Sequence, residues 1–331
     1  MIAAAFLALA GGGKCDEKPD MRIVAVAAPG NAFGDAVTPF AFRVEAQNAV
    51  KGRLTWRLAT GTATIKSGEA ELAAGANAIK IAIPPVKDGV VLAAKLTLAA
   101  IETGKAKPTA TLERDVWIFP QSPFADRGEW LKKLKISLFD PKGATAKLFD
   151  AEKIPFEEVR DVDAVAALKG GLLIVGEGVA FGDEKGLAAA LHKHAAGGGT
   201  VLCLAPASGE LAIPGIGSTP GELEDLTFTR GIVRKLDQRL DADGWLPDGK
   251  AIASTLTVKK GDDSAVGEIA PGPGGWTWAE ANYGSGKGRW AICGLAIVAK
   301  WEAGPTPRFL FARMLEYLTD PTVDPKKENG R

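Results

Sequence analysis

Two short apolar segments on either side of a helix-length segment constrain the fold of this chain most. Residues 171–176 read Gly-Leu-Leu-Ile-Val-Gly and residues 200–205 read Thr-Val-Leu-Cys-Leu-Ala, with turn residues after both. Strands of a parallel sheet are buried on both faces, so they appear as uninterrupted runs of Leu, Ile and Val. The pattern predicts a β-α-β unit whose helix runs from about residue 183 to residue 196.

Other segments continue this alternation of strands and helices. Asp161 is placed to cap a helix over 161–168, because an aspartate side chain accepts hydrogen bonds from the first helical turn. Alternating elements imply right-handed crossovers and a doubly wound α/β sheet. The other predicted elements of this domain are strands at 135–140, 156–159 and 289–295, helices at 145–154 and 307–318, strand-like runs at 229–236, 252–258, 266–269 and 276–283, and a Gly/Pro-rich loop at 209–222.

The N-terminal part of the chain has a different pattern. Apolar and polar residues alternate along its segments, so that Leu54, Trp56 and Leu58 fall on one face of a strand. Strands separated by turn residues, with no helical period, predict an antiparallel Ig-like β-sandwich, with Trp56 packed between its two sheets. The predicted organisation is a signal-like segment and tether at 1–21, the all-β sandwich at 22–119, a linker at 120–132, the α/β domain at 133–319 and a flexible tail at 320–331.

Composition limits the chemistry that the chain can perform. Lys plus Arg and Asp plus Glu both number 40, so no charge excess favours a nucleic-acid partner. Two histidines and three cysteines offer few ligands for a metal ion, and we predict neither a metal site nor a cofactor. Cys203 and Cys293 fall within predicted strands and are interpreted as small buried hydrophobic residues.

The N-terminus resembles the end of a secretory signal peptide. Residues 1–10 are apolar, and Ala8-Leu9-Ala10 matches a small-residue cleavage pattern. We therefore expect export to the periplasm or cell envelope. Cys15 resembles the anchor cysteine of a bacterial lipoprotein, although Lys14 stands where that motif has a small residue. Lipid attachment at Cys15 is the one route by which we expect contact with a membrane.

The second half of the chain resembles a known domain family. The matching features are the strand at 172–175 with its Gly176-Glu177-Gly178 turn, the Gly197-Gly198-Gly199-Thr200-Val201 segment, and the ending at 286–295 followed by Pro307 and a helix. Residues 133–319 are similar to the class I glutamine-amidotransferase-like (flavodoxin-like) domain attached to bacterial glycoside hydrolases and β-galactosidases. The resemblance implies a three-layer α/β domain, and a preceding Ig-like sandwich is compatible with it.

The same resemblance argues against the activity of that family. Active members carry a cysteine nucleophile on the tight turn after the strand that corresponds to 200–205, and a catalytic histidine late in the domain. Here the turn reads Ala205-Pro206-Ala207-Ser208-Gly209, and no histidine follows His194. The resemblance therefore implies that the catalytic residues are missing.

Other catalytic arrangements are weighed against simpler interpretations. Ser208 would need His192 or His194 as a base, but these histidines are two residues apart on one predicted helix and point to different faces. The glycines of 176–182 do not complete a dinucleotide-binding pattern. The acidic pairs that a glycosidase requires occur only in polar, turn-like stretches, where a solvated surface is the favoured interpretation. We assign no catalytic residue.

The predicted binding residues fall into two groups. Asp140, Glu177 and Ser208 follow parallel strands, and ligands of open α/β sheets bind beyond the carboxyl ends of such strands. The second group is aromatic, because exposed tryptophans stack on sugar rings or seat a protein partner, whereas buried ones belong to the core. Its members are Trp276, Trp278 and Trp301.

The sequence thus predicts an exported, non-catalytic binding or scaffolding protein. The expected partner is a carbohydrate or another envelope protein, an inference that depends on the family resemblance. Two alternatives stay open: a hydrolase acting on a glycan or ester through an unrecognised site, and a partner module of a membrane transporter or envelope assembly.

Overall fold

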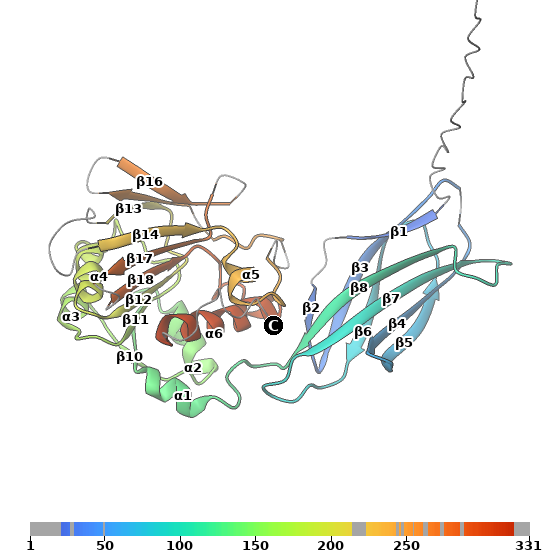
Figure 1. Cartoon of the computed structure of the whole chain (residues 1–331), viewed down its shortest axis with the longest axis horizontal. Coiled ribbons are helices and arrows are strands. Elements are labelled where there is room, and N and C mark those ends of the chain that lie inside the picture. Colours follow the sequence, from blue (N-terminus) through green and yellow to red (C-terminus); the bar gives the residue numbers. More distant parts are fainter. Residues whose placement is uncertain are drawn as a thin grey trace, which may run out of the picture.

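Strands dominate the part of the chain that the structure describes. A computed structural model describes residues 21–26, 30–48, 50–213, 223–242, 245, 248–253, 255–260, 264–271, 275–284 and 288–320. These residues form four sheets, and the helices among them all follow the eight strands of the N-terminal part (Figure 1). The protein is therefore mostly β, with a helix-containing part that begins at residue 128.

Two sheets pack face to face in the N-terminal part, which we call the sandwich half. One has the strand order β1-β3-β6 and the other β2-β8-β7-β4-β5. Alternate residues point inward, and Leu54 and Leu58 of one strand lie in their common core. The strands are β1 (Met21–Ala25), β2 (Asn31–Phe33), β3 (Ala36–Ala46), β4 (Gly52–Thr60), β5 (Ala63–Glu71), β6 (Gly75–Ile83), β7 (Leu92–Glu102) and β8 (Ala110–Phe119).

Trp56 occupies a different place from the one predicted. It is half-buried and packs against the margin of the sandwich core rather than in its middle. Its cross-strand partner on β5 is Gly68, and a Cβ atom there would lie 2.5 Å from the indole ring. The indole thus covers a glycine of the neighbouring strand, a contact that alternation within one strand does not reveal.

A seven-stranded sheet forms the centre of the second part, which we call the α/β half. Its order is β10-β9-β11-β12-β18-β17-β14, and the first five strands are parallel. The predicted β-α-β unit is confirmed, since Leu172 pairs with Thr200 in parallel register. The strands are β9 (Ile136–Phe139), β10 (Phe156–Glu158), β11 (Leu172–Val175), β12 (Thr200–Leu204), β14 (Leu223–Thr229), β17 (Trp278–Tyr283) and β18 (Gly288–Cys293).

Helices cover the two faces of this sheet. Asp161 caps α3 as predicted, because its carboxylate accepts the backbone N–H of Ala164 at 2.7 Å. One face packs mainly against α2 and α6, and the opposite face against α3 and α4. The helices are α1 (Gly128–Leu134), α2 (Ala144–Ala151), α3 (Val162–Ala167), α4 (Leu187–Ala196), α5 (Ile232–Leu236) and α6 (Pro305–Thr319), with a 3₁₀ turn, η1, at Trp301–Ala303.

Two predictions for the segment after β12 are wrong. The predicted loop at 209–222 begins with a strand, β13 (Gly209–Ile213), which pairs with β15 (Leu256–Lys260) in a small sheet completed by β16 (Ser264–Ile269). The predicted strand at 229–236 is instead the end of β14 followed by α5. Short apolar runs fit both periods, so packing decides between strand and helix there. Residues 214–222 lie outside the described residues.

The segment predicted as a linker, 120–132, is packed against the α/β half. Phe119, the last residue of β8, is fully buried in the helical core of the α/β half, where its ring lies 4.6 Å from that of Phe309. Phe124 is buried in the same core, and α1 starts at Gly128. The last sandwich strand therefore leads directly into the core of the α/β half.

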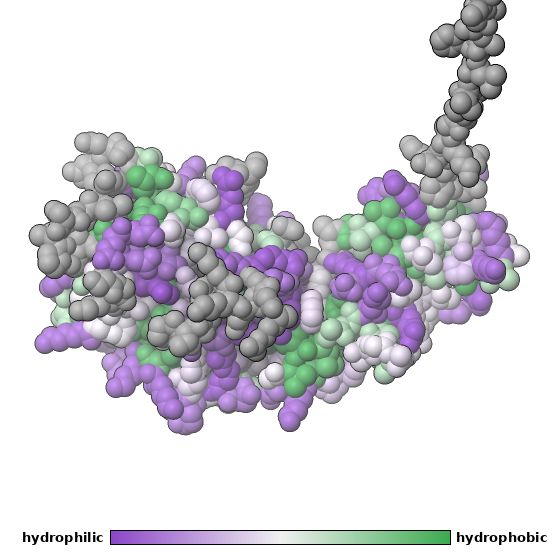
Figure 2. Space-filling model, viewed as in Figure 1, coloured by the Kyte–Doolittle hydropathy of each residue, from purple (hydrophilic) through white to green (hydrophobic). Residues whose placement is uncertain are grey.

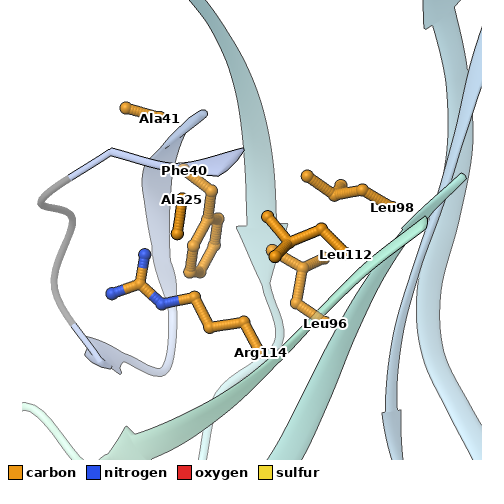
Figure 3. A pocket seen from close by; sticks show the side chains of 7 residues that line it. All are labelled: Ala25, Phe40, Ala41, Leu96, Leu98, Leu112 and Arg114. Carbon is orange, nitrogen blue, oxygen red and sulfur yellow. The ribbon is translucent and has the colours of Figure 1, made fainter. Parts of the chain in front are cut away.

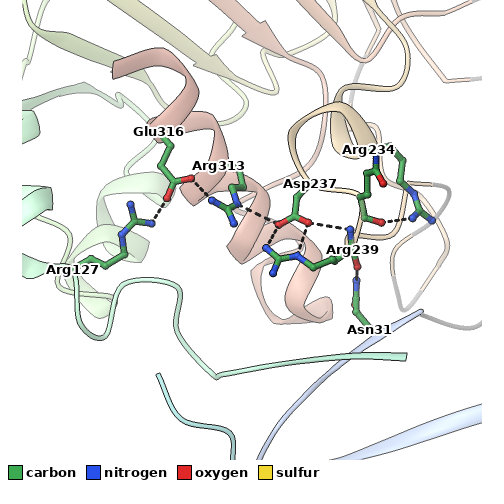
Figure 4. Close-up of polar contacts among 8 residues, drawn as sticks. Asn31, Arg127, Arg234, Asp237, Arg239, Arg313 and Glu316 are labelled. Carbon is green, nitrogen blue, oxygen red and sulfur yellow. Dashed lines mark hydrogen bonds and ion pairs between the residues drawn. The ribbon is translucent and has the colours of Figure 1, made fainter. Parts of the chain in front are cut away.

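Polar contacts also join the sandwich half to the α/β half, at a contact region that we call the junction. The side-chain amide of Asn31 donates to Thr306 Oγ1 at 3.0 Å, and the Gly30 N–H donates to Asp241 Oδ1 at 2.8 Å. Next to Asn31, a chain of ion pairs runs from the residue before α1, across α6, to the segment after α5 (Figure 4). Its members, in order, are Arg127, Glu316, Arg313, Asp237 and Arg239.

Candidate functional site

The carboxyl ends of the parallel strands bring Asp140 and Glu177 together, as the sequence predicts. Asp140 follows β9, and Glu177 follows the adjacent strand β11. A Cβ atom on Gly176 would lie 2.5 Å from Asp140 Oδ1, so only glycine allows the two turns to approach this closely. The Glu177 N–H also donates to Thr145 Oγ1 at 2.9 Å, which ties this corner to α2. We call this region the strand-end crevice.

Asp140 uses one carboxylate oxygen to hold a helix. Its Oδ2 accepts the backbone N–H of Ala146 at 2.9 Å, in the first turn of α2. A carboxylate at this position satisfies a free N–H and interacts favourably with the helix dipole. The Oδ1 atom is buried and makes no hydrogen bond within the described residues. The hydrogen bond that Oδ2 accepts is therefore a structural one.

Glu177 fastens the segment that follows β18. Its carboxylate accepts the N–H groups of Val298 at 2.6 Å and Ala299 at 3.1 Å. Burial raises the pKa of this carboxyl group, and the backbone N–H groups of the 297–299 turn oppose that shift. Both oxygens are thus engaged by the chain itself, although the two segments lie more than one hundred residues apart.

Ser208 lies beyond β12, next to an open groove of about 470 Å³. Its hydroxyl accepts the N–H of Thr255 at 3.2 Å. The groove is lined by Asp183 and by the ion pair of Lys259 with Glu210, and none of its described lining residues is aromatic. This lining suits a small polar molecule or solvent better than a sugar ring, which stacks on aromatic faces.

The two histidines lie at the opposite end of β12 from Ser208, so neither can act as a base for its hydroxyl. They lie near the carboxyl end of α4, which leads into the amino end of β12, whereas Ser208 lies beyond the carboxyl end of that strand. His192 Nδ1 is 3.2 Å from the Tyr283 hydroxyl, and His194 packs against Gly199. A serine–histidine pair is therefore not formed.

The turn after β12 contains a residue that sequence reasoning missed. Ala205 has a φ of 32°, a left-handed conformation that costs a non-glycine residue about 1–2 kcal/mol. Its N–H donates to the Cys293 carbonyl at 2.6 Å, and its own carbonyl accepts the Gly178 N–H at 2.9 Å. The sequence offers no signal for this conformation, because alanine is common in every kind of element.

The predicted tryptophans do not form one surface. Trp278 and Trp301 are 1% and 2% exposed, and their indole N–H groups donate to Glu280 and Glu152. This burial corrects their assignment as binding residues. Trp276 is half-buried, with the Arg230 guanidinium 4.4 Å from its ring centroid, which leaves less of its face for a sugar.

A small, partly open cavity lies within the described part of the sandwich half. It lies between the sheets beside Arg114, among Phe40, Leu96 and Leu98 (Figure 3). Its volume is about 10 Å³, which is room for about one water molecule. This cavity is too small for an organic ligand.

Figure 2 shows one face of the described outer surface. Hydrophilic side chains cover much of the described surface there, and apolar side chains appear as separate small areas. Within the described ranges, no group of three or more His, Cys, Asp or Glu side chains is placed to hold a metal ion. No helix in that part of the chain is long and apolar enough to cross a bilayer. Cys15 lies outside the described residues.

The two described cysteines are expected to be unreactive in the folded protein. Cys203 and Cys293 are free and fully buried, and burial raises the pKa of each thiol to about 12. Since the thiolate is the reactive form, a Cys15→Ser chain should show no labelling by a thiol reagent at pH 8. The same chain in denaturant should label at both thiols. Rapid labelling of the native chain would contradict this burial.

Acidification is expected to destabilise the α/β half through His194. This imidazole is 3% exposed, and neither ring nitrogen makes a hydrogen bond of good geometry with the described residues. Burial lowers its pKa, and the backbone of Leu168 and Gly171 opposes that shift. Below about pH 6.5 the unfolded chain binds a proton that the folded chain does not, so stability falls by up to about 1.4 kcal/mol per pH unit. Urea unfolding between pH 5 and 7 should show this slope, and His194→Leu should reduce it. His192→Gln is the control that keeps His194, and an unchanged slope in His194→Leu would contradict the assignment.

Comparisons with known proteins do not identify a family. No protein-family model matches the chain, and no curated protein matches it. The fibronectin(III)-like modules of Clostridium thermocellum CbhA are similar at 14% identity over 30% of this chain and 94% of theirs, with a TM-score of 0.21. An engineered protein is similar at 15% identity over 30% of this chain and 20% of its own, also with a TM-score of 0.21. At these TM-scores neither likeness bears on the fold or function of this chain.

Proposed function

We propose that the protein is an exported, non-catalytic binding or scaffolding protein. In this proposal an Ig-like sandwich precedes a degenerate class I glutamine-amidotransferase-like (flavodoxin-like) domain. The order of the parallel strands supports the second assignment. Numbered along the chain, β10-β9-β11-β12-β18 is 2-1-3-4-5, which is the flavodoxin-like order of a doubly wound sheet.

The observation that carries the proposal is the use of the polar side chains of the strand-end crevice. Asp140, Glu177 and Ser208 each accept a hydrogen bond from a backbone N–H of this chain. Nearby turn N–H groups, including those of Gly176 and Gly178, also donate to backbone carbonyls, so they do not form an open cradle for an anion. Asp140 Oδ2, both Glu177 oxygens and the Ser208 hydroxyl accept from the chain itself, and Asp140 Oδ1 is the one of these carboxylate oxygens without a partner among the described residues. A crevice whose acceptors are mostly used in this way supports a structural rather than a chemical role.

Ala205 gives independent support. The family resemblance places the cysteine nucleophile in the turn after β12, where Ala205 has a positive φ and presents only a methyl group. Positive φ values of non-glycine residues cluster at functional turns, so this turn is consistent with an ancestral site that has lost its reactive side chain. A carbohydrate or another envelope protein is the proposed partner, and that part depends on the resemblance and on the signal-like segment at 1–10.

An activity screen tests the absence of catalysis. The purified chain is assayed against nitrophenyl glycosides, nitrophenyl esters and glutamine, together with Ser208→Ala and the control Ser67→Ala on exposed β5. We expect no turnover above buffer from any of the three proteins. Turnover that Ser208→Ala abolishes and Ser67→Ala retains would overturn the proposal and favour the hydrolase alternative. Retention on immobilised envelope glycans, compared with bovine serum albumin, tests the proposed carbohydrate partner.

A further inference from the structure

The strand β6 is an unusually unprotected sheet edge. It is nine residues long, pairs with β3 without a register shift, and carries one charged residue, Lys80. Sheet edges in native proteins are normally short, bulged or rich in charge, because an open edge pairs with other chains. Among the described strands, the equally long edge strand β5 has such protection, namely a register irregularity and the side chains of Lys66, Glu69 and Glu71.

Proline 39 determines which backbone groups of β6 face outward. Pro39 lies opposite Lys80 and has no N–H to donate, so this pair occupies a non-hydrogen-bonded position of the antiparallel ladder. The N–H and C=O groups of Lys80 then point away from β3. Since the pattern repeats every second residue, the same holds for Ala76, Ala78 and Ala82, and none of the four makes another backbone hydrogen bond in the described part of the chain.

The side chains of β6 permit another strand to approach. Ala76, Ala78 and Ala82 are small and exposed, while Ile79 and Ile81 point into the sandwich core. The junction with the α/β half is built from β2 and the end of β8, so β6 is not part of it. The edge is therefore available to a partner strand.

We propose that β6 pairs antiparallel with β6 of a second copy of this chain, around a two-fold axis at Ile79. This register is the one in which all of Gly75–Ile83 overlaps with itself. Ala78 then lies opposite Lys80 of the other copy, so the two lysines do not face each other, and each inward residue stays opposite an inward residue. The formal net charge of the chain is zero, so the two copies do not repel each other at long range. Two three-stranded sheets thereby join into one continuous sheet, independently of the proposed function.

Solution mass provides the first test. Sedimentation equilibrium of the full chain should give twice the monomer mass of 34.5 kDa. Ala78→Lys places a second lysine opposite Lys80 and should raise the dissociation constant at least tenfold. The control Ala63→Lys makes the same change at an exposed position of β5 and should leave the dimer intact. A wild-type monomer at 0.1 mM or above, as an order-of-magnitude ceiling, or a dimer unaffected by Ala78→Lys, would overturn the proposal.

Disulfide trapping tests the register without depending on the folding of Ala78→Lys. Ala78→Cys and Lys80→Cys are made separately in a Cys15→Ser chain and mixed overnight. Directly opposite residues of a hydrogen-bonded pair have Cα atoms about 5.5 Å apart, within disulfide reach, whereas diagonal neighbours are about 7–8 Å apart. We expect a cross-linked dimer from the mixture and little from either variant alone. No cross-link in the mixture, or equal cross-linking in each variant alone, would overturn the proposed pairing.

Discussion

Replacing Glu177 by alanine is expected to lower the free energy of unfolding by about 2–4 kcal/mol, because charge-assisted hydrogen bonds to the Val298 and Ala299 N–H groups are lost together. The Val298 N–H is partly buried, where an unmade hydrogen bond is costly, whereas the Ala299 N–H is exposed and can turn to water. Urea unfolding followed by circular dichroism measures this difference. The result would show that the most prominent carboxylate of the strand-end crevice holds the fold together.

Two further variants give this experiment its controls. Glu177→Gln keeps an acceptor oxygen and removes the cost of burying a charge, so it should lose less stability than the alanine variant. Glu157→Ala removes an exposed carboxylate of the same half and should change stability by at most about 0.5 kcal/mol. If Glu177→Ala were as stable as Glu157→Ala, the carboxylate would be free for a ligand, contrary to the proposed structural role.

Replacing Phe119 by alanine is expected to cost about 3–5 kcal/mol, the usual loss for a buried phenylalanine. Phe119 ends a sandwich strand but is fully buried in the α/β core beside Phe309. The substitution should therefore destabilise α6, and amide hydrogen exchange of residues 309–318 should accelerate.

Ile118 provides the matched comparison for Phe119. It is the preceding residue of β8 and is equally buried, but it packs into the sandwich core. Ile118→Ala should accelerate exchange in β3 and β7 and affect α6 much less. If Phe119→Ala left α6 unchanged, the two halves would have separate cores, and the packed connection at 120–127 would not couple them.

Local pattern predicted much of the secondary structure. The runs at 172–175 and 200–204 are parallel strands. They are recognisable in the sequence because a strand buried on both faces is a nearly continuous run of apolar residues. The Asp161 cap was predictable because its partner is three residues away. Both features are recognisable from residues that lie close together in the sequence.

The errors arise where distant residues decide the outcome. Glu177 was predicted at the strand-end crevice, but its partners, Val298 and Ala299, come from the other end of the domain. Trp278 and Trp301 were ambiguous for the same reason, since only tertiary packing tells a buried indole from an exposed one. The positive φ of Ala205 has no sequence signal at all.

Amide hydrogen exchange at Val298 and Ala299 is the sharpest test of the structural role of Glu177, because these two N–H groups report whether its carboxylate accepts their hydrogen bonds. We expect slow exchange in the wild-type chain and exchange accelerated about thirtyfold or more in Glu177→Ala, the factor that corresponds to about 2 kcal/mol. Fast exchange at both positions in the wild-type chain would contradict this role, since the carboxylate would then be unpaired and open to a substrate.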